Sequence, residues 1–327
     1  MIPVAIVTGF LGSGKTTLIS RILRDAAFTR TAVIVNEFGE IGLDHELIAS
    51  SDETLLALTT GCLCCAIRSD LVATLLDLQS RREAGEIAYD RVLIETSGLA
   101  DPAPILHALM TEQDIARHHF IDGIVTVVDA LHGDTTLDSH PEARRQAALA
   151  DRLLLSKTDV AGPVPALRQR LAVLNPGAPQ FIAAEAAPRH LFTGTTVATR
   201  FATLPDQPAR DPFSRAQHAD GIETITLQRD RPIPALALTL LLEALAEHCG
   251  ARLLRVKGLV HIEEMPERPA VIHGVQHVFS PPEFLAQWPS ADHTTRLVFI
   301  TQGVPRHFPT RLLEAIEQEV REELEPS

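Results

Sequence analysis

The chain has 327 residues, of which 45% are hydrophobic and 22% charged, so it is long enough for two domains and ordinary for a globular protein. Its formal net charge of −13 argues against nucleic acid or an anionic membrane surface as a partner, because affinity for phosphates comes mostly from Lys and Arg. No apolar run approaches the roughly 20 residues needed to cross a bilayer, and no signal peptide is evident.

The first predicted element is a buried strand at residues 2–7, followed by GFLGSGKTT at residues 9–17. Apolar residues then recur at helical spacing from Leu18 to Leu23. A strand, a glycine-rich loop and a helix are the context of the P-loop motif GxxxxGK(S/T). The loop N–H groups and the positive end of the helix favour a bound phosphate, so the sequence predicts a nucleoside triphosphate site.

Within this motif, Lys15 is expected to reach the β- and γ-phosphates and to serve catalysis. The Thr16 hydroxyl is expected to bind Mg²⁺. The residues predicted to surround the phosphates are Gly9, Gly12, Ser13, Gly14, Lys15, Thr16 and Thr17.

Further strands are predicted at residues 32–35, 55–58, 91–94, 124–128 and 153–155, and helical patterns cover 71–78, 142–149 and 164–174. Apolar strands that alternate with helices are typical of a mostly parallel sheet covered on both faces. We therefore expect a doubly wound α/β domain over residues 1–200.

Residues 201–219 are rich in proline and polar side chains and are predicted to be a linker. Residues 220–327 are predicted to form a smaller α+β domain. Its expected strands are 222–227, 252–261, 270–277 and 296–301, and its expected helices are 234–248 and a final one from about Pro309.

An acidic residue ends the strand predicted at 91–94, in the sequence Glu95-Thr96-Ser97-Gly98. Downstream of a P-loop this pattern indicates a Walker B element with a γ-phosphate sensor. Glu95 would act in catalysis by holding the hydration shell of Mg²⁺, and the Gly98 N–H would contact the γ-phosphate.

The strand predicted at 153–155 leads into Ser156-Lys157-Thr158-Asp159, which is similar to the guanine-reading NKxD element of GTPases. The Asp159 carboxylate would accept hydrogen bonds from guanine, whereas adenine presents an acceptor there. Ser156 departs from the pattern because it cannot make the amide contact, so guanine selectivity depends mainly on Asp159 and the Lys157 stem. The alternative is that Asp159 only caps a helix.

A cluster of thiols, Cys62, Cys64 and Cys65, lies in the sequence GCLCC at residues 61–65. Clustered thiols indicate a reduced compartment, which favours the cytoplasm, and they suit a soft or borderline metal. A second pair of ligands is absent, so an open, exchangeable site is expected. Further ligands could come from Glu37, Glu40, Asp44 and His45; the alternative is a set of inert core cysteines. Cys249 is predicted to be a buried apolar residue.

Apart from His45, the histidines form no tight chelating motif and are interpreted as ordinary residues. The most prominent are His107, His118, His119, His132 and His140.

Taken together, GFLGSGKTT, VNEFGE at 35–40, GCLCC, ETSG, SKTD and the later Arg255-Val256-Lys257-Gly258 resemble the CobW family of P-loop GTPases. The resemblance implies a metallochaperone that hydrolyses GTP and delivers Zn²⁺, or in some branches Co²⁺, to a client protein. It implies metal ligands at Cys62, Cys64 and Cys65, with Glu37 at a position implicated in metal binding. A His-rich loading run found in many members is missing here.

Two other functions remain open: a nucleotide-regulated metal sensor with little turnover, and a P-loop small-molecule kinase. The kinase hypothesis leaves the cysteines unexplained. The residue that positions the attacking water could be Glu37, Asp44 or Glu95, and the sequence leaves self-association into a homo-oligomer open.

Overall fold

The computed structural model describes residues 1–36, 55–58, 64–194 and 221–324. The chain divides into two compact units, Met1–Thr195 and Thr196–Ser327. The predicted linker lies outside the described residues, and each unit is considered by itself. No described helix combines the length and the apolar character that a membrane span requires.

The first unit is built on a seven-stranded sheet in the order β3-β2-β4-β1-β5-β6-β7, in which every pair of neighbours is parallel. Its strands are β1 (Ile2–Thr8), β2 (Thr31–Asn36), β3 (Leu55–Leu58), β4 (Arg91–Thr96), β5 (His119–Asp129), β6 (Arg152–Ser156) and β7 (Gln180–Ile182). The central strand β1 is almost wholly buried, as its continuous apolar sequence predicts for a strand covered on both faces.

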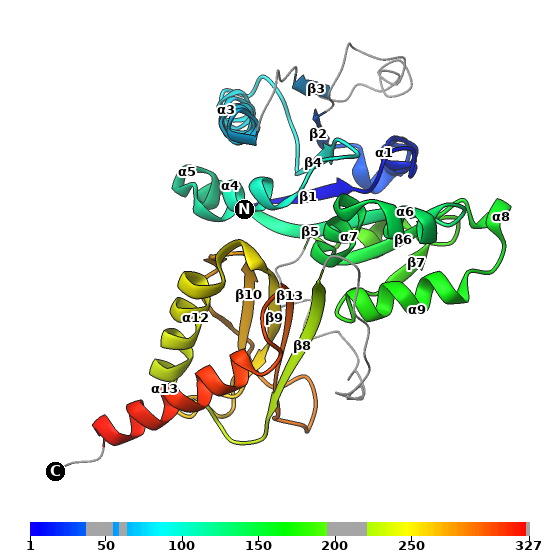
Figure 1. Cartoon of the computed structure of the whole chain (residues 1–327). Helices are drawn as coiled ribbons and strands as arrows, with labels where there is room; N and C mark the ends of the chain where they lie inside the picture. The colour runs from blue at the N-terminus through cyan, green and yellow to red at the C-terminus, as the bar shows by residue number, and fades with distance from the viewer. Residues whose placement is uncertain (37–54, 59–63, 195–220, 325–327) are drawn as a thin grey trace. The chain divides into compact units, whose positions relative to one another are not determined.

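Helices cover both faces of this sheet (Figure 1). They are α1 (Lys15–Leu23), α3 (Cys64–Glu83), α4 (Ala103–Thr111), α5 (Gln113–His118), α6 (Gly133–Ser139), α7 (Pro141–Leu149), α8 (Thr158–Ala161), α9 (Pro165–Leu174) and α10 (Pro188–Leu191), with a 3₁₀ turn η1 (Ala26–Phe28). Helix α1 lies on one face, where Leu18, Ile19 and Ile22 join the core of the sheet, and α3, α4 and α5 lie on the other.

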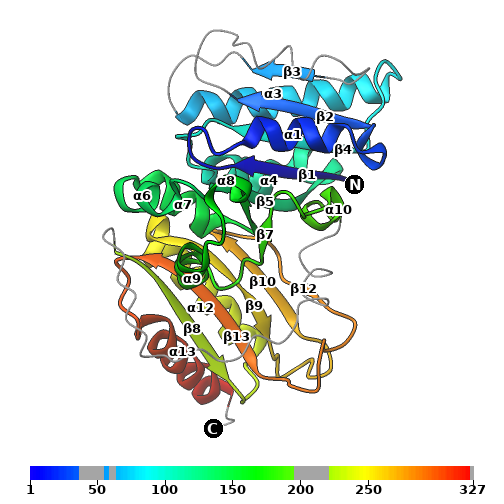
Figure 2. The same cartoon turned by 90° about the vertical axis from the view of Figure 1, so that its right-hand side faces the viewer.

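The second unit contains a sheet in the order β11-β10-β9-β13-β8, with β12 paired to β10, and its neighbouring strands are antiparallel. The strands are β8 (Ile222–Arg229), β9 (Leu253–Val260), β10 (Ala270–Val275), β11 (Val278–Phe279), β12 (Glu283–Phe284) and β13 (Thr295–Gln302). Helices α12 (Ala235–Cys249) and α13 (Phe308–Leu324), with the 3₁₀ turn η2 (Gly250–Arg252), pack against it (Figure 2). Cys249 is a free, buried member of this core, as predicted, and burial raises the pKa of its thiol.

The structure explains why the RVKG sequence ends in a glycine, Gly258. A Cβ at this position would stand 1.9 Å from the Arg296 carbonyl oxygen on the neighbouring strand. Only glycine allows β9 and β13 to approach this closely. Arg255, in contrast, is buried and contacts the His273 ring nitrogen Nε2 at 3.3 Å.

The fold class is confirmed: a doubly wound parallel sheet and a smaller α+β unit. Among the details that differ from the sequence pattern, two have a plain physical reason. The strand expected at 270–277 ends at Val275, because Gln276 takes a φ of 53° and turns the chain into β11. Strand β7 was missed because its three half-buried residues carry too little periodicity to be recognised.

Candidate nucleotide-binding site

The carboxyl ends of β1, β4 and β6 bring the three predicted nucleotide motifs to one edge of the first sheet. The P-loop follows β1, and the register pairs Val7 with Glu95 on β4. On the other side of β1, Asp129 at the end of β5 is paired with Ser156 at the end of β6. Ligands of open α/β sheets bind outside the carboxyl ends of the strands, and these residues lie there.

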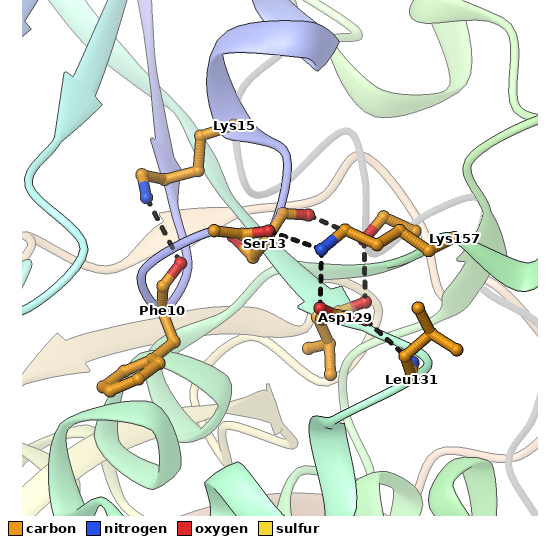
Figure 3. A network of polar contacts seen from close by, with 9 residues as sticks. Phe10, Ser13, Lys15, Asp129, Leu131 and Lys157 are labelled. Atoms are coloured by element: carbon orange, nitrogen blue, oxygen red, sulfur yellow. Dashed lines mark hydrogen bonds and ion pairs between the residues drawn. The ribbon is translucent and has the colours of Figure 1, made fainter. Parts of the chain in front are cut away.

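The P-loop backbone depends on glycine. Gly9 has a φ of 143°, and a Cβ there would stand 2.2 Å from the Val127 carbonyl oxygen, so this position requires glycine. Gly14 has a φ of 97° and forms the N-cap of α1. Lys15 is buried, and its Nζ donates to the Phe10 carbonyl oxygen at 3.3 Å (Figure 3). The Lys15 side chain therefore folds back over the P-loop backbone. Its ammonium lies at the N-terminal, positive end of α1.

Thr16 and Glu95, predicted from separate motifs, are in direct contact. The Thr16 Oγ1 donates to Glu95 Oε1 at 2.9 Å, and Glu95 is only 3% exposed. A hydroxyl and a buried carboxylate at this distance form an oxygen-rich pair of the kind that suits Mg²⁺ or its water shell. Of the other predicted phosphate residues, Ser13 is buried and Thr17 is exposed on α1.

Gly98 lies in a tight turn against the P-loop. The Ala100 N–H donates to the Ser97 carbonyl oxygen at 3.1 Å and closes the turn. A Cβ on Gly98 would stand 2.7 Å from the Leu11 backbone nitrogen. The turn after β4 and the P-loop thus touch through backbone atoms, which no larger residue would permit.

Two side chains of the SKTD element donate hydrogen bonds to the P-loop backbone. Ser156 Oγ donates to the Ser13 carbonyl oxygen at 2.6 Å, and Lys157 Nζ donates to the Gly12 carbonyl oxygen at 2.8 Å. Ser156 therefore contacts the loop backbone through its hydroxyl although it lacks the amide of the NKxD pattern. Asp159 is exposed in the first turn of α8.

Asp129 is a site residue that sequence reasoning missed. Its Oδ2 lies 2.7 Å from Lys157 Nζ, and its Oδ1 accepts from the Leu131 N–H at 2.8 Å (Figure 3). Burial alone would raise the pKa of Asp129, but the bonds from Lys157 and the Leu131 N–H outweigh it and hold the pKa below its usual value. The available signal was a carboxylate directly after the strand predicted at 124–128.

The predicted metal ligands are only partly located. Cys62 and Glu37, with the additional candidates Glu40, Asp44 and His45, lie outside the described residues. Cys64 and Cys65 form the start of α3, and only their backbone is described. Over the ranges that the structure does describe, no three His, Cys, Asp or Glu side chains gather into a metal site.

The histidines vary in their surroundings. His132 and His118 are exposed, whereas His119 is buried and burial lowers its pKa. The His140 ring lies 4.4 Å from that of Phe10, centroid to centroid, and so packs beside the P-loop.

The parallel sheet and the P-loop with its associated motifs define a P-loop nucleotide-binding protein. A family model described as the CobW/HypB/UreG nucleotide-binding domain matches residues 3–181, and one described as the cobalamin synthesis protein cobW C-terminal domain matches residues 222–317. The chain belongs to the CobW family, which confirms the resemblance identified from the motifs.

Known relatives resemble the chain over about half of its length or nearly all of it. It is 34% identical over 305 residues to the zinc chaperone YjiA of Escherichia coli, covering 93% of this chain and 95% of that protein. It is 35% identical over 206 residues to the zinc-regulated GTPase metalloprotein activator 1 of Saccharomyces cerevisiae, covering 55% and 47%. The crystal structure of the zinc-bound YjiA GTPase from E. coli superposes with a TM-score of 0.76 at 27% identity, covering 96% and 98%.

Proposed function

We propose that this protein is a GTP-hydrolysing metallochaperone that carries Zn²⁺ to a client protein. The observation that carries the proposal is the meeting of Lys15, the Thr16–Glu95 pair and the SKTD element on one sheet edge. The relative named as a zinc chaperone and as a GTPase, which matches nearly the whole chain, supports it, as does the zinc-regulated GTPase that matches about half of the chain.

In this proposal, the P-loop N–H groups and Lys15 bind the phosphates, and Thr16 and Glu95 hold Mg²⁺ and its water shell. The Gly98 turn senses the γ-phosphate. Asp159 reads guanine, while Ser156 and Lys157 hold the base-reading segment against the P-loop. Hydrolysis is an attack of water on the γ-phosphorus that releases phosphate and leaves GDP.

The cargo metal is bound by the thiolates of Cys62, Cys64 and Cys65, with Glu37 as a further oxygen ligand. The relatives named as zinc chaperones favour Zn²⁺, and Co²⁺ is the other candidate. Three cysteines so close together in the sequence are expected to be kept reduced, which favours a cytoplasmic location.

Cobalt(II) titration under anaerobic conditions tests the metal site, because thiolate ligation produces an intense sulfur-to-metal charge-transfer band. We expect the wild type with GTP bound to show this band at about one Co²⁺ per chain and to lose it as pH falls, because the thiols must deprotonate to bind metal and a free thiol has a pKa of ~8.5. The variant in which Cys62, Cys64 and Cys65 are replaced by Ser should lack the band and keep GTP binding.

Turnover is measured in the same samples, with Lys15→Ala as the control that should abolish hydrolysis because the β- and γ-phosphates lose their fixed cation. A triple variant that retains the charge-transfer band would move the metal site elsewhere. If the wild type binds GTP and metal but does not turn over with metal and client present, the protein is a sensor rather than a chaperone.

A further inference from the structure

Helix α7 contributes a buried glutamine to the nucleotide edge of the sheet. Gln146 is 1% exposed, and its Nε2 donates to the Gly98 carbonyl oxygen at 3.1 Å and to the Ala100 carbonyl oxygen at 3.0 Å. Because both partners are acceptors, the amide nitrogen must face them. Both N–H donors of one side chain are thus used on the turn that follows β4.

Helix α7 also holds the residue that follows Ala100 in this turn, Asp101. Arg145 NH1 lies 3.0 Å from Asp101 Oδ2 in a half-exposed ion pair. The helix itself is anchored to the sheet, since Thr126 Oγ1 on β5 donates to the Gln146 backbone carbonyl oxygen at 2.8 Å. Gln146 therefore connects a fixed part of the sheet to the Gly98 turn.

The position of this turn matters because Gly98 is in backbone contact with the P-loop at Leu11. The Gly98 carbonyl belongs to the peptide that leaves Gly98, so a hydrogen bond to it restrains the ψ angle of this residue. A glycine without such a restraint would sample many conformations, and ordering it on ligand binding would cost entropy.

We propose that Gln146 is a positioning residue that keeps the Gly98 turn ready to contact the γ-phosphate and so sets the preference for triphosphate over diphosphate. The inference rests on the proposed function, in which Gly98 senses the γ-phosphate. Gln146 acts through the turn and touches no phosphate itself.

The test compares the affinities of the full chain for GTPγS and GDP in Gln146→Glu. The glutamate has the same shape, but its ionised form cannot donate and would face two carbonyl oxygens. Its pKa should be raised by burial, and the protonated acid can restore one of the two bonds. We expect the GTPγS-to-GDP affinity ratio to fall about tenfold at about pH 8, as two buried hydrogen bonds are lost, and to recover partly at about pH 6.

Two further variants keep the test decisive if the glutamate disturbs folding. Gln146→Met has similar length and no donor, so its ratio should fall equally at both pH values. Thr126→Val removes the anchor of α7 without touching the turn, so it should lower the Tm and leave the ratio within about twofold of the wild type.

A wild-type ratio in Gln146→Glu and Gln146→Met would overturn the inference, as would an equal loss in Thr126→Val, which would make Gln146 a structural residue only. If the wild type binds GTPγS and GDP but the ratios do not change, the proposed function stands. Absence of nucleotide binding by the wild type would overturn both.

Discussion

At the scale of single residues, Lys157 shows how a strained backbone can serve a site. It has a φ of 56°, a left-handed conformation that costs a residue with a Cβ about 1–2 kcal/mol. In this conformation its Nζ reaches both Asp129 and the Gly12 carbonyl oxygen. Because the Lys157 side chain is 38% exposed, its ion pair with Asp129 orients the lysine more than it stabilises the fold.

Asp159 carries the base selectivity in the proposed mechanism. Asp159→Asn replaces one carboxylate oxygen by an amide donor, so we expect the preference for GTP over ATP to fall by about tenfold, roughly the loss of one charge-assisted hydrogen bond. Competition of ATP with a fluorescent GTP analogue measures this. If the wild type itself shows no preference for GTP, the Ser at position 156 has removed the selectivity and our assignment of the base is wrong.

At the scale of elements, the turn after β4 and the P-loop form one packed unit. Gly98→Ala would place a Cβ 2.7 Å from the Leu11 backbone nitrogen and 2.8 Å from its Cα, so the two segments would have to separate. We expect a loss of GTP affinity of about tenfold or more together with a lower Tm, since backbone atoms cannot give way as a side chain can.

Gly177→Ala is the matched control, because the nearest atom to its Cβ would be the Asn175 side-chain oxygen at 3.7 Å, an ordinary contact. Its stability should stay within about 0.5 kcal/mol of the wild type. Equal behaviour of the two alanine variants in calorimetry and nucleotide titration would contradict the close packing of the turn against the loop.

At the scale of the whole molecule, the proposed function requires that nucleotide and metal influence one another. The GCLCC sequence lies in the chain between VNEFGE at residues 35–40 and β4, whose end carries Glu95. In the proposed function, the segments around the γ-phosphate change on hydrolysis and alter how the thiolates are arranged. The coupling free energy in such systems is about 1–3 kcal/mol, and it acts equally in both directions.

We expect Co²⁺ to bind about 5–150-fold more tightly with GTPγS than with GDP, and the metal to raise the affinity for GTPγS over GDP by the same factor. Anaerobic metal titrations in each nucleotide state and nucleotide titrations with and without metal measure the two sides. Equal metal affinity in both nucleotide states would leave a metal-binding GTPase without a switch.

The sequence alone determined the class of this protein, because its strongest features are local. The P-loop at residues 9–17 needs its glycines for the geometry that Gly9 and Gly14 adopt, and those requirements are visible in one short segment. The alternating strands and helices likewise predicted the parallel sheet, since buried parallel strands must be apolar on both faces. The motifs identified the family for the same reason.

Only the tertiary structure decided which side chains meet. The contact of Thr16 with Glu95 spans 79 residues, and that of Lys157 with Asp129 spans 28. Gln146 had no motif to reveal it, because its role depends on where α7 packs against the turn after β4. Such partners are set by strand order and register, which follow from the packing of the entire sheet rather than from any one stretch of sequence.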